Sequence, residues 1–257
     1  MHYNTKVTFY NNEIQISRYG YNIYKKSDKE LIFKDDDETV VMSDKQSFIS
    51  REKSIKDSDK NNKVRSVRRS KQSIYEIARA NEWDYFVTFT MCNDRYNYDL
   101  CKSRLLKFLN NFKMRKVPDM EYLIVPEQHI DLAWHFHGLI RGNIDMYLSD
   151  TWRKDRFEIV GYKLGKCEVE KVKDTHRIAS YITKYITKEL ANLLKNKRRY
   201  FYSKGIKKGD SVEMLVASDI SNIDFVLGNF PEYEITYVRT TEYNGNRIDY
   251  IQLRRQD

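Results

Sequence analysis

The chain has 257 residues, of which 32% are charged and 40% hydrophobic, and its formal net charge is +9. That length allows one sizeable domain with appendages or two small ones. No apolar run is long enough to span a bilayer and no secretory signal pattern is present, so we expect a cytoplasmic protein without a membrane partner. The three cysteines, Cys92, Cys101 and Cys167, have neither zinc-ribbon nor disulfide spacing, which also suits a reducing compartment.

The first part of the chain, residues 1–72, is interpreted as an accessory segment ending in a basic linker. Short alternating stretches at Val7–Tyr10 and Ile14–Ile16 predict a few strands. The acidic run Asp35–Glu38 is more typical of a solvated turn than of a metal site. Residues 51–72 are highly charged and predict a linker or a basic helix.

A sharper pattern of elements defines a domain over residues 78–210. Its strands are expected at 83–90, 122–127, 134–141 and 166–172, and its helices at 100–114 and 175–194. This order of elements predicts an α+β fold with a central antiparallel sheet and helices packed on it. Residues 211–257 return to strand-like alternation and form a C-terminal, strand-rich extension whose role the sequence does not reveal.

Two basic clusters without acidic residues flank the central motifs, at 60–75 and 195–208. The second is interrupted by Tyr200-Phe201-Tyr202, and aromatic rings among positive charges suit unpaired bases and a phosphate backbone. A solvated basic face is the alternative for either cluster taken alone. The candidate DNA-binding residues are Arg65, Arg68, Arg69, Lys197, Arg198, Arg199 and Lys204.

The segment Trp134-His135-Phe136-His137 places two histidines on one face of a strand, because alternate strand residues point the same way. If the preceding strand turns symmetrically about Asp131, Glu127 lies opposite His135 on that face. Two imidazoles and a carboxylate suit Mg²⁺ or Mn²⁺. His129 could assist from the turn. The alternative is an ordinary solvent-facing strand, where His-x-His is also common.

In Tyr181-Ile-Thr-Lys184-Tyr185-Ile-Thr-Lys188, the two tyrosines and two lysines have helical spacing and form one predicted stripe. A lysine one turn away stabilises a phenolate and so makes tyrosine a better nucleophile. Tyr181 and Tyr185 are therefore candidate nucleophiles, with Lys184 and Lys188 as their supporting cations. Tyrosines at the edge of an amphipathic helix are also common packing residues, which is the alternative.

These motifs together resemble the HUH-endonuclease superfamily, and specifically the rolling-circle replication initiators of bacterial plasmids and single-stranded DNA phages. Residues 86–90 resemble the supporting-strand motif, residues 134–138 the paired-histidine motif, and residues 179–185 the nucleophile motif in its two-tyrosine form. The resemblance extends over about residues 80–210. Glu127 falls where the family's carboxylate ligand precedes the histidines.

The resemblance implies metal-dependent nicking and rejoining of single-stranded DNA at a replication origin, through a 5′-phosphotyrosine intermediate, in a bacterial host cell. Tyr181 is expected to attack first, because an alanine precedes it by two residues. A host polymerase would extend the liberated 3′-hydroxyl. The Gly161–Cys167 segment departs from a phosphate-binding loop, so a host helicase is also expected. The alternatives are a non-catalytic origin-binding protein or repressor, and a tyrosine transposase.

Overall fold

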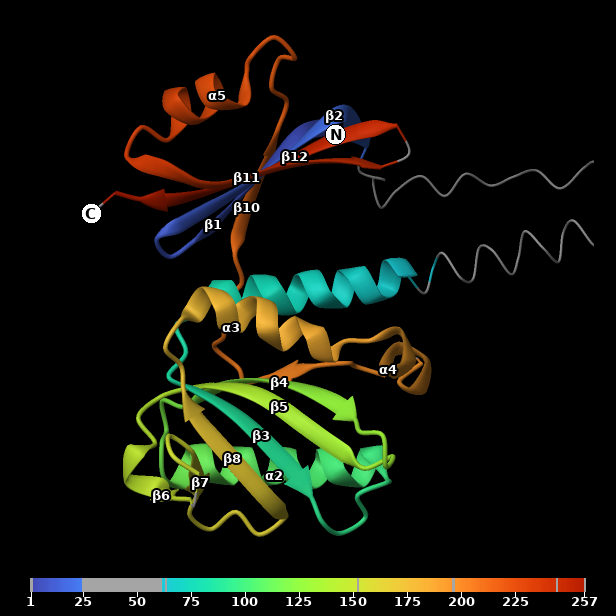
Figure 1. Cartoon of the computed structure of the whole chain (residues 1–257), viewed down its shortest axis with the longest axis vertical. Coiled ribbons are helices and arrows are strands. Elements are labelled where there is room, and N and C mark those ends of the chain that lie inside the picture. Colours follow the sequence, from blue (N-terminus) through green and yellow to red (C-terminus); the bar gives the residue numbers. More distant parts are fainter. Residues whose placement is uncertain are drawn as a thin grey trace, which may run out of the picture. The chain divides into compact units, whose positions relative to one another are not determined.

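The computed structural model describes residues 2–24, 62, 64–151, 153–195, 197–243 and 245–256. The chain divides into two compact units (Figure 1). One unit combines residues 1–44 with residues 209–257, and the other contains residues 45–208. The expected turn at Asp35–Glu38 lies outside the described residues.

The first unit is built on a five-stranded antiparallel sheet in the order β10-β1-β2-β12-β11. Its elements are β1 (His2–Tyr10), β2 (Glu13–Tyr24), β10 (Asp210–Met214), α5 (Asn222–Asn229), β11 (Tyr233–Tyr243) and β12 (Asn246–Arg255). Phe225 and Val226 of α5 join Ile16 and Leu253 in a buried cluster. The strands expected at Val7–Tyr10 and Ile14–Ile16 are confirmed.

The sequence reading separated residues 1–72 from residues 211–257, whereas the structure pairs strands from both segments in this one sheet. β2 and β12 are direct neighbours, with Ile16 opposite Ile251. The helix α5 was not expected either, because eight residues give too short a periodic pattern.

The second unit is built on a seven-stranded antiparallel sheet in the order β6-β7-β8-β3-β5-β4-β9. Its strands are β3 (Tyr85–Met91), β4 (Glu121–Gln128), β5 (Trp134–Arg141), β6 (Leu148–Asp150), β7 (Phe157–Ile159), β8 (Gly165–Lys171) and β9 (Phe201–Tyr202). The four strands expected here are confirmed as β3, β4, β5 and β8. The three short strands β6, β7 and β9 were not foreseen, and the α+β fold class is confirmed.

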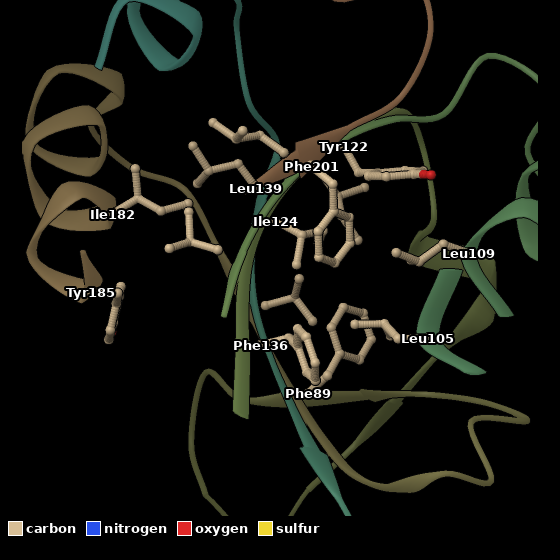
Figure 2. Packing of buried hydrophobic residues seen from close by; sticks show 14 of the residues in the cluster. Phe89, Leu105, Leu109, Tyr122, Ile124, Phe136, Leu139, Ile182, Tyr185 and Phe201 are labelled. Carbon is tan, nitrogen blue, oxygen red and sulfur yellow. The ribbon is translucent and has the colours of Figure 1, made fainter. Parts of the chain in front are cut away.

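Helix α2 (Tyr98–Arg115) covers one face of this sheet (Figure 1). Asn97 caps its first turn by accepting a hydrogen bond from the backbone N–H of Leu100. Leu105 and Leu109 pack with Phe89 and Phe136 of the sheet, and all four are fully buried (Figure 2). Gly138 also lies within the sheet, and a Cβ there would collide with side chains of the neighbouring strands. The glycine after the second histidine therefore allows the strands to pack closely.

The opposite face carries a helix over residues 64–79, α3 (Thr175–Ile182), the 3₁₀ turn η2 (Thr183–Tyr185) and α4 (Lys188–Leu193). One further 3₁₀ turn, η1 (Asp145–Tyr147), directly precedes β6. The basic helix expected within residues 51–72 is thus present from residue 64. Ile182 lies on this side of the strands, away from Leu105 and Leu109 (Figure 2). None of the helices in the described residues is long and apolar enough to cross a membrane.

The prediction of one continuous helix over 175–194 was wrong. The chain is extended at Ile186, with φ −86° and ψ 93°, and Thr187 then caps α4 by accepting a hydrogen bond from the backbone N–H of Leu190. Threonine favours such a cap over a helix interior. Ile182, Ile186 and Leu190 are nevertheless all buried. The apolar pattern correctly predicted burial but not the backbone between these residues.

Candidate active site

Three neighbouring strands bring polar side chains to the face of the sheet that α3 covers. Glu127 of β4 lies opposite His135 of β5, so the expected symmetric turn about Asp131 is confirmed. On the other side of β5, Thr90 lies opposite His135 and Thr88 lies opposite His137. Because directly opposed residues share a face, these five side chains form one polar patch on an otherwise apolar surface.

The two threonines of β3 hold the two imidazoles. Thr88 Oγ1 lies 3.1 Å from Nδ1 of His137, and Thr90 Oγ1 lies 3.3 Å from Nδ1 of His135. These contacts fix the rings and leave the Nε2 atoms for other partners. Oriented in this way, a histidine is a better metal ligand, because its ring no longer has to be ordered on binding.

Nε2 of His137 lies 2.7 Å from Oε2 of Glu127. Burial works against the charge on Glu127, but the hydrogen bond to His137 and the nearby histidines outweigh it and lower the pKa of the carboxyl. Burial lowers the pKa of His135, and the adjacent His129 and His137 add to the effect. At neutral pH the site therefore holds an ionised carboxylate beside a neutral His135, the protonation states that metal ligation requires.

The donor types in this patch fit a divalent cation, with one carboxylate and two imidazoles whose Nδ1 atoms are already occupied. His129, from the turn, stacks beside His135 with ring centroids 5.1 Å apart. Within the described part of the chain, however, no three His, Cys, Asp or Glu side chains are grouped closely enough to enclose an ion. Instead, Glu127 and His137 bond directly to each other.

Tyr185 covers the patch from the helical side. Its ring stacks on His137 with centroids 3.6 Å apart and planes within 10°, and it is only 7% exposed. Its hydroxyl donates to the hydroxyl oxygen of Tyr181 at 3.1 Å. Tyr181 packs edge-on against Phe86 and is 42% exposed. The two tyrosines are therefore joined, with the outer one accessible and the inner one clamped over a histidine.

Lys184 lies over both rings, with Nζ 3.5 Å from the centroid of Tyr181 and 4.9 Å from that of Tyr185. Burial opposes ionisation of Tyr181, but hydrogen bonds from Lys184 and Tyr185 and the ammonium charge prevail and lower its pKa. Burial raises the pKa of Tyr185, and its role as donor to Tyr181 raises it further. Tyr181 is thus the more readily ionised of the pair.

The break before α4 separates Lys188 from this arrangement. Lys188 begins α4 and is exposed, so the predicted four-residue stripe ends at Tyr185. In contrast, Arg156 was not foreseen, although its positive charge contributes to lowering the pKa of Tyr181. No spacing in the sequence relates Arg156 to the tyrosines. The threonines of β3 could have been found, because they alternate with the apolar residues of a predicted strand.

The predicted DNA-binding residues lie in the same unit as the patch. Arg65, Arg68 and Arg69 belong to the helix over residues 64–79, and Lys197, Arg198, Arg199 and Lys204 follow α4. Arg199 donates to the hydroxyls of Ser66 and Ser70 at 2.9 and 3.3 Å. The structure therefore brings the two basic clusters of the sequence together.

Residues 84–190 match the family of the replication-associated protein ORF2. The matched region runs from the residue before β3 into α4 and includes every residue of the polar patch and both tyrosines. No curated protein and no solved structure matches the chain. The match supports a replication-associated, initiator-like role for this protein.

Proposed function

We propose that the protein is a metal-dependent replication initiator of the HUH type that nicks and rejoins single-stranded DNA through Tyr181. The observation that carries the proposal is the contact chain on one sheet face. Tyr181 accepts a hydrogen bond from Tyr185, Tyr185 stacks on His137, and His137 bonds to Glu127. A nucleophile of lowered pKa thus adjoins a set of nitrogen and oxygen donors.

In the proposed reaction, the Tyr181 oxygen attacks a backbone phosphorus and the bond from phosphorus to the 3′ oxygen breaks. The 3′ oxygen leaves with the electron pair and takes up a proton, while the 5′ side stays bonded to the tyrosine. Lys184 stabilises the phenolate before attack. Attack by the released 3′-hydroxyl on the phosphotyrosine reverses the step and rejoins the strand.

Glu127, His135 and His137 would hold a divalent cation, Mg²⁺ or Mn²⁺. When bound, such an ion polarises the scissile phosphate and offsets the charge that develops during transfer. Thr88 and Thr90 keep the imidazoles oriented. Tyr185 orients Tyr181 by hydrogen bonding in the first step and is the candidate for a second attack. Lys188 remains a weaker candidate, because it begins a separate helix.

The proposal is tested by incubating the protein with single-stranded fragments of its own replicon, with and without Mn²⁺, and separating the products on a denaturing gel. We expect a covalent protein–DNA adduct that requires the metal. Tyr181→Phe should lower its rate about a thousandfold or more, Tyr185→Phe should lower it less, and the double variant should give none. Tyr24→Phe, at an exposed tyrosine of the other unit, is the matched control.

Cleavage without an adduct would instead identify a hydrolytic nuclease. Tight binding without cleavage of any fragment would identify an origin-binding protein or repressor. Joining of cut ends into an unrelated target would identify a transposase. In the initiator reading, a host helicase separates the strands and a host polymerase extends the 3′-hydroxyl in the cytoplasm of a bacterial host.

A further inference from the structure

A groove of about 480 Å³ lies where the two basic clusters meet. Ser66 and Ser70 of the helix over residues 64–79 form one wall. The segment 197–200 and Tyr202 of β9 form the rest. Apart from the serines and tyrosines, every lining side chain is positively charged, so the groove suits an anionic ligand with an aromatic or planar part.

Arg199 gives the groove an anion-binding centre. Its guanidinium is fixed by Ser66 and Ser70, and its Nε is buried without a hydrogen-bond partner in the described residues. Burial lowers the pKa of Arg199, and the like charge of Arg69 lowers it further. No carboxylate of the described chain forms an ion pair with it. A phosphate would satisfy both the unpaired donor and the uncompensated charge.

The neighbouring positive groups differ in how available they are. Lys197 is already paired with Asp99 at 2.6 Å. The backbone at Arg198 is held by the hydroxyl of Tyr98, which donates to its carbonyl oxygen at 3.1 Å. The segment that carries Arg199 is therefore fixed from α2 before any ligand binds, which reduces the entropy lost on binding.

Two tyrosines provide a stacking surface beside this centre. The rings of Tyr200 and Tyr202 are nearly parallel, with centroids 6.1 Å apart and planes within 21°. Lys208 lies over the ring of Tyr202 at 5.7 Å. Tyr202 is partly exposed. Such rings accept an unpaired base of any identity, because every base has a flat face.

The groove lies on the same sheet face as the tyrosine site. Tyr202 of β9 pairs with Leu123 of β4, and Glu127 follows four residues along β4. An even separation keeps side chains on one face, and four strand residues span about 13 Å. One DNA strand could therefore occupy both places.

We propose that this groove holds an unpaired nucleotide of the DNA strand that the tyrosine site cleaves, with its phosphate at Arg199 and its base on the Tyr200–Tyr202 surface. The proposal rests on the proposed function for the identity of the strand. It makes the groove selective for single-stranded over double-stranded DNA, since only an unpaired base exposes a face for stacking.

The test uses the full chain with Tyr181→Phe and Tyr185→Phe, so that binding is measured without covalent capture. Fluorescence anisotropy with a labelled oligothymidine gives the affinity at several salt concentrations. Adding Tyr202→Leu should weaken binding about 5- to 150-fold. Adding Arg199→Gln should reduce the slope of log affinity against log salt by about 0.7. Duplex DNA of the same length should show no loss from Tyr202→Leu.

Arg115→Gln removes the same charge from the end of α2, on the other face of the sheet, and is the matched control. Arg199→Lys keeps the charge without the planar fork, and thermal melting of each variant checks that it folds. Unchanged single-strand affinity in folded Tyr202→Leu and Arg199→Gln variants would overturn the groove proposal, even if the wild type forms the adduct. Lost affinity in these variants, with no adduct in the wild type, would instead retain the groove and reject the proposed nuclease.

Discussion

On the face of the seven-stranded sheet that α2 covers, Phe89 and Phe136 are fully buried among apolar neighbours. On the opposite face, the same two strands present Thr88, His135 and His137. The two faces thus differ by a shift of one residue along each strand. The apolar face fixes the register, because a slip would bury the histidines and expose the phenylalanines. The fixed register in turn places the polar groups within bonding distance.

This contrast predicts that substitutions under α2 change stability, whereas substitutions on the polar patch change activity. The following tests take the two faces in order of expected effect.

Leu105→Ala, on the buried side of α2, should lower the free energy of unfolding by about 2–5 kcal/mol, because it leaves a cavity in the core. The adduct rate of the folded fraction should stay near that of the wild type. Denaturant unfolding and the adduct assay at low temperature measure both. Leu100→Ala, at an exposed leucine of the same helix, is the control and should change little. A large loss of activity in folded Leu105→Ala would break the division between the faces.

Thr88→Val should have the opposite profile. Removing the hydroxyl beside Nδ1 of His137 frees the imidazole to rotate, so the metal-dependent adduct rate should fall about 10- to 100-fold. The Mn²⁺ concentration for half-maximal rate should rise, a change that a merely structural role would not produce. Thr241→Val on β11 is the control. Unchanged metal dependence would show that Thr88 does not position the histidine.

Lys184→Gln should change the pH dependence of the reaction. Lys184 helps to lower the pKa of Tyr181, so its removal raises that pKa and reduces the phenolate fraction at neutral pH. The rate at pH 7 should fall about tenfold for each unit by which the pKa rises. The rising limb of the pH–rate profile should move to higher pH, and Lys184→Arg should largely restore it. Profiles that coincide would contradict the role of Lys184.

The cysteines give the smallest and simplest test. Cys92 is exposed, whereas Cys101 and Cys167 are buried on the α2 side, and burial raises the pKa of Cys167 to about 12. One thiol per chain should react quickly with a disulfide reagent at pH 8, and Cys92→Ser should remove that fast phase. Fast reaction of all three thiols would show that the α2 face opens readily.

The sequence was sufficient for the main elements of the central unit and for the pairing of Glu127 with His135, because both depend on short-range patterns. A turn symmetric about Asp131 was enough to set that register. The break at Ile186 was missed because Ile182, Ile186 and Leu190 keep helical spacing and are all buried. Spacing reports which side chains meet the core, and the same burial is reached here by two short helices.

Long-range pairings were beyond the sequence for a different reason. Nothing local in β2 specifies that its neighbour is β12, and nothing in Arg199 specifies Ser66 and Ser70. The charges of the groove were visible, but its hydroxyl partners were ordinary helix residues. The asymmetry between Tyr181 and Tyr185 was likewise invisible, since it depends on which hydroxyl donates to the other.

The order of strands in the first unit has a consequence for how the protein is made. β12 lies between β2 and β11, so the sheet lacks an interior strand until the last residues of the chain emerge from the ribosome. Residues 45–208, by contrast, contain all seven strands of their own sheet and can fold during synthesis. The β1–β2 hairpin is made first and completed last, and meanwhile one of its edges is available to chaperones or to other nascent chains.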